Sequence, residues 1–263
     1  MTEIFEELVE LLRAGRSVAL ASVISASGST PQGAGARMLV TAGGRAHSTI
    51  GGGRFEAAVI EDAKKAVLSG KSVIKEYDLS GTGEGVGMLC GGRATVAIDV
   101  ITPPQRLVIF GAGHVGRALA ETALGLGFAI SVIDDRAEYL SADRFPDGVS
   151  LHLTSADYDN DIPQLDENAF VAVVTRSHEC DLSVLRLTVG TDTAYLGMIS
   201  SKRKANEIFA RLRSEGVSED ALRKVHAPIG IDIGSKTPKE IAISILAEIV
   251  KVRNARRKAG AAK

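Results

Sequence analysis

The chain has no tryptophan, and aromatic residues make up only 4% of it. Proteins that bind single-stranded nucleic acid stack bases on aromatic side chains, so this scarcity argues against that function. Neither charge is in excess, with 31 Lys and Arg against 32 Asp and Glu, so no basic surface for nucleic acid is expected. No apolar run approaches the roughly 18 residues of a membrane-spanning helix. We therefore expect no nucleic acid and no membrane among the partners of this chain.

Cysteine is scarce as well, since the chain has only Cys90 and Cys180. They supply no disulfide framework, and the acidic, amphipathic residues 1–7 do not resemble a signal peptide. These features are typical of a reducing compartment, so we expect a cytoplasmic protein. With 263 residues, 45% of them hydrophobic, the chain is long enough for one large or two modest domains.

Glycine, by contrast, is abundant, and many of the 28 glycines gather in loops. The most informative of these loops lies within residues 106–136. Two short apolar runs, 107–110 and 128–133, enclose the sequence Gly-Ala-Gly-His-Val-Gly at 111–116 and a helical segment at 117–126. This order of strand, glycine turn, helix and strand predicts a Rossmann-type unit.

Each residue of this turn has a predicted task. Gly111 permits a tight turn, Gly113 lets the backbone approach a pyrophosphate, and Gly116 lets the helix pack close to the strand. The helix N-terminus attracts a phosphate, and Asp134, about 20 residues on, is placed to accept hydrogen bonds from ribose hydroxyls. His114 either contacts a ligand or merely lies at the helix start. The alternative for the whole unit is a packing device with an empty crevice.

Strands and helices alternate through residues 105–263, which predicts a doubly wound parallel sheet. In such a sheet, the loops that follow the strands line the ligand crevice. We expect Arg176 and His178 in that crevice, together with Lys202 from the loop after the next strand. The alternative for these side chains is a solvated, charged surface.

Residues 1–102 predict a separate mixed α/β domain, joined to the second domain by Pro103-Pro104. A helix here follows Gly51, Gly52 and Gly53, which either offer backbone N–H groups to an anion or only reverse the chain.

Glu56 of the first domain is either a cofactor contact or an exposed surface residue. Further on, Cys90 is followed by Gly91 and Gly92 at the start of a strand. The thiol of Cys90 either acts as a thiolate ligand for a soft metal or packs as a small buried hydrophobe.

Several motifs, taken together, resemble the XdhC/CoxI family, the accessory proteins of xanthine dehydrogenase and related molybdenum hydroxylases. They span nearly the whole chain in family order, which makes them far more specific than any one motif. The matching motifs are Gly28-Ser29-Thr30-Pro31, Gly35-Ala36-Arg37-Met38, Gly51-Gly52-Gly53 with Glu56, Cys90-Gly91-Gly92, the glycine turn at 111–116, Thr175-Arg176-Ser177-His178 with Asp181, Tyr195-Leu196-Gly197-Met198-Ile199, Ser201-Lys202-Arg203-Lys204 and Pro228-Ile229-Gly230-Ile231-Asp232-Ile233-Gly234.

The resemblance implies an XdhC/CoxI domain over 1–102 and a Rossmann-type domain over 105–263. It implies a non-catalytic chaperone that binds the molybdenum cofactor, molybdopterin, and protects it from oxidation. Help with sulfuration through a cysteine desulfurase, and insertion into a molybdenum hydroxylase client, are implied too, as is a homodimer. The glycine motifs, Glu56, His114, Asp134, Arg176, His178 and Lys202 become cofactor-binding candidates, and Cys90 the candidate metal contact.

Two other functions remain open from the residues. One is an NAD(P)-dependent oxidoreductase, for which Asp134 suits the adenosine ribose, although no Tyr-Lys pair or other proton-relay pattern is evident. The other is a nucleotide-sensing Rossmann protein, which would leave the glycine motifs of the first domain without a purpose. The sequence leaves open whether the crevice holds a nucleotide, the molybdenum cofactor or nothing.

Overall fold

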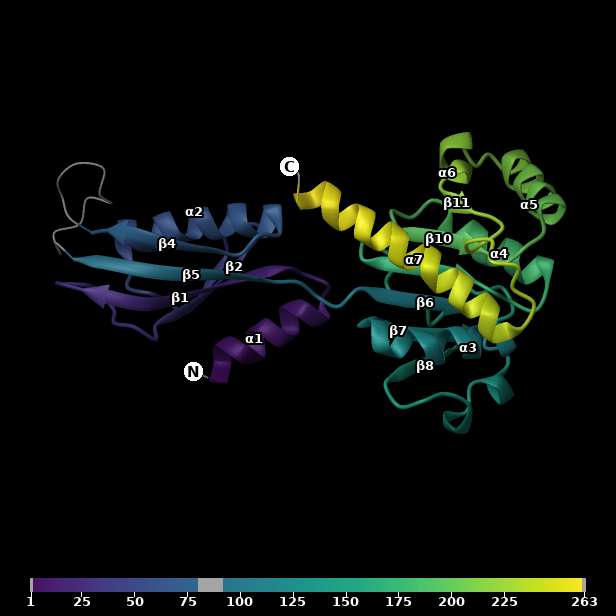
Figure 1. The fold of residues 1–263 in the computed structure, drawn as a ribbon, viewed down its shortest axis with the longest axis horizontal. Helices are drawn as coiled ribbons and strands as arrows, with labels where there is room; N and C mark the ends of the chain where they lie inside the picture. Colours follow the sequence, from purple (N-terminus) through teal and green to yellow (C-terminus); the bar gives the residue numbers. More distant parts are fainter. Residues whose placement is uncertain (1, 80–91, 262–263) are drawn as a thin grey trace. The chain divides into compact units, whose positions relative to one another are not determined.

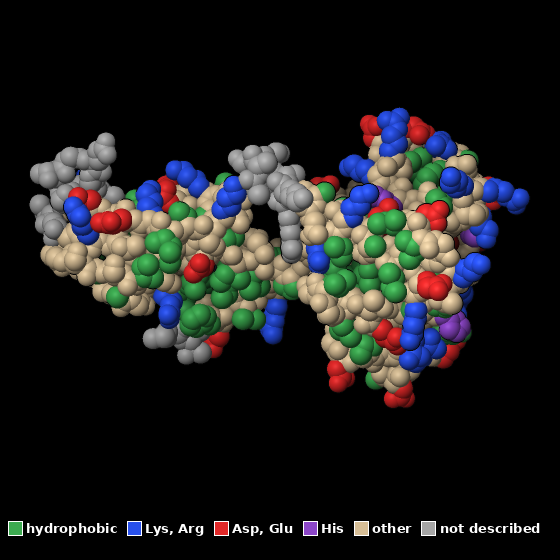
Figure 2. Space-filling model, viewed as in Figure 1, with side chains coloured by type: hydrophobic (Ala, Val, Ile, Leu, Met, Phe, Trp, Pro, Cys, Tyr) green, Lys and Arg blue, Asp and Glu red, His purple; other side chains and the backbone are tan. Residues whose placement is uncertain are grey.

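The computed structural model describes residues 2–79 and 92–261. The chain divides into two compact units, which meet between Pro103 and Pro104. On the face shown in Figure 2, acidic and basic side chains are interspersed over each unit. No helix in the described part of the chain combines the length and the apolarity needed to cross a bilayer.

The first unit is built on an antiparallel five-stranded sheet (Figure 1), with strand order β3-β2-β1-β5-β4. Its strands are β1 (Val18–Ser27), β2 (Arg37–Thr41), β3 (Ala46–His47), β4 (Val73–Asp78) and β5 (Arg93–Ile101).

One helix covers each face of this sheet. The helix α2 (Gly53–Ser69) buries Phe55 and Val59 against one face, and α1 (Thr2–Arg13) packs Ile4 and Leu11 against the other. Successive strand residues point to opposite faces, so neighbouring residues of β1 contribute to different sides of the sheet.

The second unit is a six-stranded sheet in which every strand pair is parallel. The strand order is β11-β10-β9-β6-β7-β8, which is the order of the dinucleotide-binding fold. Its strands are β6 (Arg106–Phe110), β7 (Ala129–Asp134), β8 (Val149–Leu153), β9 (Ala169–Val173), β10 (Tyr195–Met198) and β11 (Val225–His226). The predicted doubly wound parallel sheet is confirmed.

Helices cover both faces of this sheet, so its central strands are apolar along their whole length. On one face α3 (His114–Ala123) and α7 (Pro238–Ala261) pack against Leu107 and Ile109 of β6. On the other face α4 (His178–Thr188), α5 (Lys202–Ser214) and α6 (Glu219–Arg223) belong to the core that contains Val108 and Phe110. Three short 3₁₀ turns, at Leu124–Leu126, Ala137–Tyr139 and Ala142–Arg144, complete the unit.

This topology fixes where a ligand can bind. The strands β6 and β9 are neighbours whose following helices, α3 and α4, lie on opposite faces of the sheet. The loops after these strands therefore diverge and leave a crevice at the carboxyl edge of the sheet.

Candidate functional site

The glycine turn between β6 and α3 is closely packed except at one position. Gly111 has φ +114°, and a Cβ there would lie 2.4 Å from the carbonyl oxygen of Val174. A Cβ on Gly116 would lie 1.8 Å from the carbonyl oxygen of Gly111, but one on Gly113 would meet nothing within 4 Å. Gly111 and Gly116 are thus needed for packing, and open space lies beside Gly113 at the start of α3.

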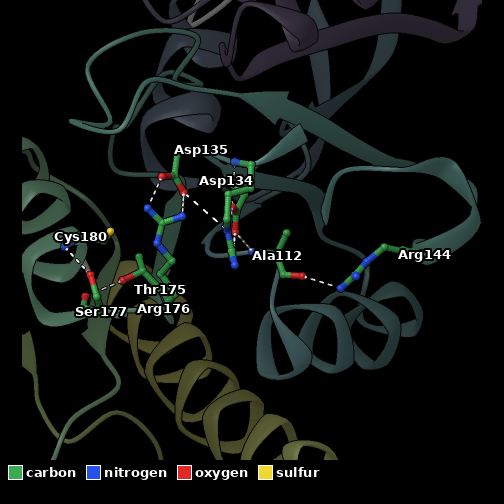
Figure 3. Close-up of polar contacts among 9 residues, drawn as sticks. Ala112, Asp134, Asp135, Arg144, Thr175, Arg176, Ser177 and Cys180 are labelled. Carbon is green, nitrogen blue, oxygen red and sulfur yellow. Dashed lines mark hydrogen bonds and ion pairs between the residues drawn. The ribbon is translucent and has the colours of Figure 1, made fainter. Parts of the chain in front are cut away.

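Asp134, at the end of β7, ties this turn to the sheet (Figure 3). Its Oδ2 accepts hydrogen bonds from the Ala112 amide at 2.7 Å and from Nη2 of Arg136 at 3.0 Å. Its Oδ1 accepts from the amide and Nε of Arg136 at 3.0 and 2.9 Å. A carboxylate has roughly four lone-pair sites, and these four protein donors use them. The side chain is 1% exposed, so the structure gives Asp134 the task of holding the turn.

The electrostatics of Asp134 follow from these contacts. Burial by itself raises the pKa of this carboxyl group. The hydrogen bonds from the Arg136 guanidinium and the Ala112 amide outweigh burial and hold the pKa of Asp134 below its usual value. Asp134 is therefore ionised at neutral pH and paired with Arg136.

A second acid at this strand end, Asp135, is also covered by an arginine. Arg176 approaches it with both terminal nitrogens, at 2.7 Å (Nη2 to Oδ2) and 3.1 Å (Nη1 to Oδ1). The Asp135 side chain is 6% exposed and that of Arg176 is 42% exposed. The guanidinium of Arg136 lies 3.8 Å from the ring centroid of Tyr139, a cation–π contact.

Two adjoining cavities lie at the carboxyl edge of the parallel sheet, and both are lined by Thr175, Arg176 and Ile199. The smaller, of about 290 Å³, is also lined by Gly113, His114, Val115, Arg136, Tyr139 and Val174. The larger, of about 580 Å³, is also lined by Ser177, His178, Asp181, Ser200, Ser201 and Lys204.

The two cavities bring together four of the predicted site residues, Gly113, His114, Arg176 and His178. Lys202 starts α5 but lines neither cavity, and Lys204 lines the larger one in its place.

A buried acid lies at the base of the larger cavity. Asp181 is 3% exposed, and the hydroxyl of Thr175 donates to its Oδ1 at 2.5 Å. Nδ1 of His178 lies 3.8 Å from the other carboxylate oxygen. Burial raises the pKa of Asp181, and the hydrogen bond from Thr175 only partly offsets it. Within the described residues, the buried hydroxyl oxygen of Ser200 has no hydrogen-bond partner.

The triple glycine of the first unit forms a tight turn that a carboxylate fills from inside. Gly51, Gly52 and Gly53 all have positive φ, at 130°, 73° and 64°. Oε2 of Glu56 accepts from the amides of Ile50 and Gly52 at 3.2 and 3.1 Å and from the Thr49 hydroxyl. The amide of Gly51 donates to that hydroxyl at 3.0 Å. Burial raises the pKa of Glu56, but these donors outweigh it and lower the pKa.

The third glycine motif is described only in part. A Cβ on Gly92 would lie 2.5 Å from the carbonyl oxygen of Ser29, so glycine is needed for this close approach. Cys90 and Gly91 lie outside the described residues. The other cysteine, Cys180, is unpaired and 7% exposed. Within residues 2–79 and 92–261, no group of three or more His, Cys, Asp or Glu is placed to hold a metal ion.

Sequence reasoning did not single out several residues that shape this site. Asp135 and Arg136 directly follow the predicted acid, so their proximity to it was visible in the sequence. Thr175 precedes the predicted Arg176 in the same motif. Tyr139, which lies in a short 3₁₀ turn, carried no sequence signal that could have found it.

Comparison with known proteins places this arrangement in a family. The XdhC Rossmann domain matches residues 107–249, and the XdhC and CoxI family matches residues 11–78. The second unit is thus an XdhC-type Rossmann domain. The chain belongs to the XdhC/CoxI family.

Three relatives show how far this similarity extends. YqeB of Escherichia coli K12, described as uncharacterized, is 38% identical over 254 residues, which cover 95% of this chain and 46% of YqeB. A Bacillus subtilis 168 protein, named as a probable subunit of xanthine dehydrogenase, is 26% identical over 59% of this chain and 45% of its own length. The molybdenum cofactor insertion chaperone PaoD of E. coli K12 is 22% identical over 93% of this chain and 86% of PaoD. The chain thus spans less than half the length of the first two relatives.

A solved structure shares the fold. The crystal structure of a xanthine dehydrogenase from Bacillus halodurans matches with a TM-score of 0.54 and 20% identity, over 96% of both chains.

Proposed function

We propose that this protein is a molybdenum cofactor-binding chaperone that assists insertion of the cofactor into a xanthine dehydrogenase-type molybdenum hydroxylase. The observation that carries the proposal is that both halves of the chain match the XdhC/CoxI family, in order. A relative named a molybdenum cofactor insertion chaperone aligns with 93% of this chain. The relative named as part of a probable xanthine dehydrogenase supports the client class.

The crevice of the second unit fits the anionic end of a pterin cofactor. Arg176, His178 and Lys204 line the larger cavity, and Asp181 is the one carboxylate among its lining residues. Because the pKa of Asp181 is raised by burial, this acid opposes an anion less than an exposed carboxylate would. When bound, molybdopterin supplies the redox chemistry of the client enzyme, and the residues of this crevice would hold its phosphate.

The metal end of the cofactor needs a different donor. Molybdenum favours soft ligands, and a cysteine thiolate is the softest donor a protein offers. In this proposal Cys90 contacts the metal, and the glycine motifs of the first unit, with Glu56, shape the turns around it. The domains assigned to 1–102 and 105–263 then have separate tasks, one at the metal and one at the phosphate.

The remaining parts of the proposal concern partners. A cysteine desulfurase would supply sulfur to the bound cofactor, and the hydroxylase client would receive it from a homodimer of this chain in the cytoplasm. The chain is then an accessory protein with no catalytic residue of its own.

Cofactor content tests the proposal. The full chain is purified anaerobically from molybdenum-replete cells, oxidised, and assayed for the fluorescent product of the pterin. We expect pterin in amounts comparable to the protein, and none from cells that cannot make molybdopterin. The loaded chain should activate an apo-hydroxylase that free cofactor activates poorly. Absence of pterin, even after anaerobic reconstitution, would refute the carrier function.

A pair of cysteine variants tests the metal contact. Cys90→Ser should lower the molybdenum retained by the purified chain, whereas Cys180→Ser, which alters a buried thiol, should retain it. Metal content measured by mass spectrometry distinguishes the two. Equal retention by both variants would remove Cys90 from the proposal and leave the carrier function to the pterin assay.

A further inference from the structure

We infer that the smaller cavity, at the start of α3, binds a phosphate monoester and discriminates against a ligand that offers a ribose diol in its place. The inference deepens the proposed function and rests on it, because it names the chemical group by which this unit holds its cargo. It follows from the position of the acids and arginines at the end of β7.

A ribose diol is usually bound by an acid exposed at this strand end. Here the carboxylate of Asp134 is saturated by four protein donors and is 1% exposed. The carboxylate of Asp135 is 6% exposed and is covered by Arg176. Neither carboxylate lines the smaller cavity, whose ionisable lining residues in the described chain are His114, Arg136, Tyr139 and Arg176.

The exposed groups of the cavity suit a phosphate instead. A guanidinium has more N–H donors than a bidentate ion pair uses, so Arg136 and Arg176 retain donors for a ligand. A phosphate monoester carries a charge of about −1.5 to −2 and three terminal oxygens that accept such bonds.

The helix α3 adds to this preference. Its N-cap is Gly113, which supplies no side-chain cap, and open space lies where a side chain would be. The first-turn amides of α3 and the positive end of its dipole therefore favour the same anion as the arginines.

Arg176 is the residue on which this preference depends most. It lines both cavities and covers Asp135, so its removal would do two things at once. It would delete a cation from the cavity wall, and it would uncover a carboxylate that repels a phosphate and can accept hydrogen bonds from a diol.

Two ligands share the required chemistry. One is the pterin of the molybdenum cofactor, which ends in a phosphate monoester, and the other is NADP, which carries a 2′-phosphate on its adenosine ribose. The experiment therefore compares two matched pairs on the full chain by fluorescence: NADPH with NADH, and the oxidised pterin of molybdopterin with and without its phosphate. Inorganic phosphate is added as a competitor.

We expect at least one pair to show a preference of about tenfold or more for the phosphorylated member, relieved by inorganic phosphate. The pair that shows the stronger preference identifies the source of the phosphate. If neither pair shows a preference, or if NADH binds as tightly as NADPH and the pterin binds regardless of its phosphate, the inference is wrong.

Variants locate the effect. Arg176→Ala should weaken binding of the phosphorylated member about tenfold or more and bring NADPH and NADH close to equal affinity. Arg176→Lys, which keeps the charge but loses the fork, should fall between. The matched control is Arg186→Ala, since Arg186 is 46% exposed, pairs with Glu215 through Nε and Nη2, and lines neither cavity. Equal losses for Arg176→Ala and Arg186→Ala would overturn the assignment.

The outcome is separable from that of the carrier function. Pterin that co-purifies with the chain but binds equally well without its phosphate would refute this inference and leave the carrier function intact. A clear phosphate preference in a chain that never carries pterin would support this cavity and refute the carrier function.

Discussion

Replacing Asp134 with alanine should destabilise the second unit more than any surface substitution. The change leaves the guanidinium of Arg136, 21% exposed, without its bidentate partner, and it leaves the Ala112 amide without an acceptor. Removing one partner of a buried ion pair typically costs about 3–5 kcal/mol, because the other charge stays buried. A domain of this kind has roughly 5–15 kcal/mol in total, so much of its stability would be lost.

Denaturant unfolding measures this loss. The chain has no tryptophan, but three of its four tyrosines, Tyr139, Tyr158 and Tyr195, lie in the second unit, so tyrosine fluorescence reports mainly on it. The exposed Asp147→Ala is the control for loss of one negative charge. A loss below about 1 kcal/mol for Asp134→Ala would show that the four hydrogen bonds do not hold the turn.

The same variant has a pH signature. The pKa of Asp134 is lowered in the folded chain, so its stabilising contribution is present above the unfolded pKa of about 3.9. It is lost as the pH falls below that value and through the folded pKa. The wild type should therefore lose more stability than Asp134→Ala between about pH 5 and pH 2.

Three further outcomes are expected. Gly116→Ala, whose Cβ would lie 1.8 Å from a carbonyl oxygen, should cost about 3 kcal/mol in denaturant unfolding, whereas Gly113→Ala should leave stability within about 0.5 kcal/mol and weaken ligand binding in titrations; equal effects on stability would contradict the packing argument. Because burial raises the pKa of Asp181, its ionisation opposes folding as the pH rises above the unfolded value, so Asp181→Asn should be at least as stable as the wild type at pH 7, with the gap closing towards pH 4 in thermal melts; a less stable variant at pH 7 would contradict this sign. Glu248→Ala should cost about 1–3 kcal/mol, because it leaves the buried Tyr195 hydroxyl, which donates to Glu248 at 2.6 Å, without its acceptor; an unchanged melting temperature would show that water replaces the carboxylate.

The parallel sheet was predictable because its central strands are buried on both faces and so appear in the sequence as continuous apolar runs. The helix after the glycine turn was expected from Arg117 and begins at His114, since the glycines that signal the turn also form its first residues. The helix α6 and the strand β11, of five and two residues, are too short to show a periodic pattern, and nothing predicted them.

The site was predictable in position but less so in its contacts. The acid at the end of β7 lies where the spacing placed it, but spacing gives no account of which donors surround a carboxylate. Arg136, only two residues away, claims Asp134, and Arg176, far along the chain, claims Asp135. Likewise the basic run at 202–204 was visible, but helical geometry at the Ser201 N-cap decides that Lys204 faces the cavity.

The helix α7 has a practical consequence for work on fragments. It follows all six parallel strands in the chain, yet Ala242, Ile245 and Ile249 complete the apolar layer over β6. A fragment that stops after β11 would keep every strand and expose that layer to water, so it should aggregate rather than fold. Isolated versions of this unit for spectroscopy or binding work therefore need to extend through α7.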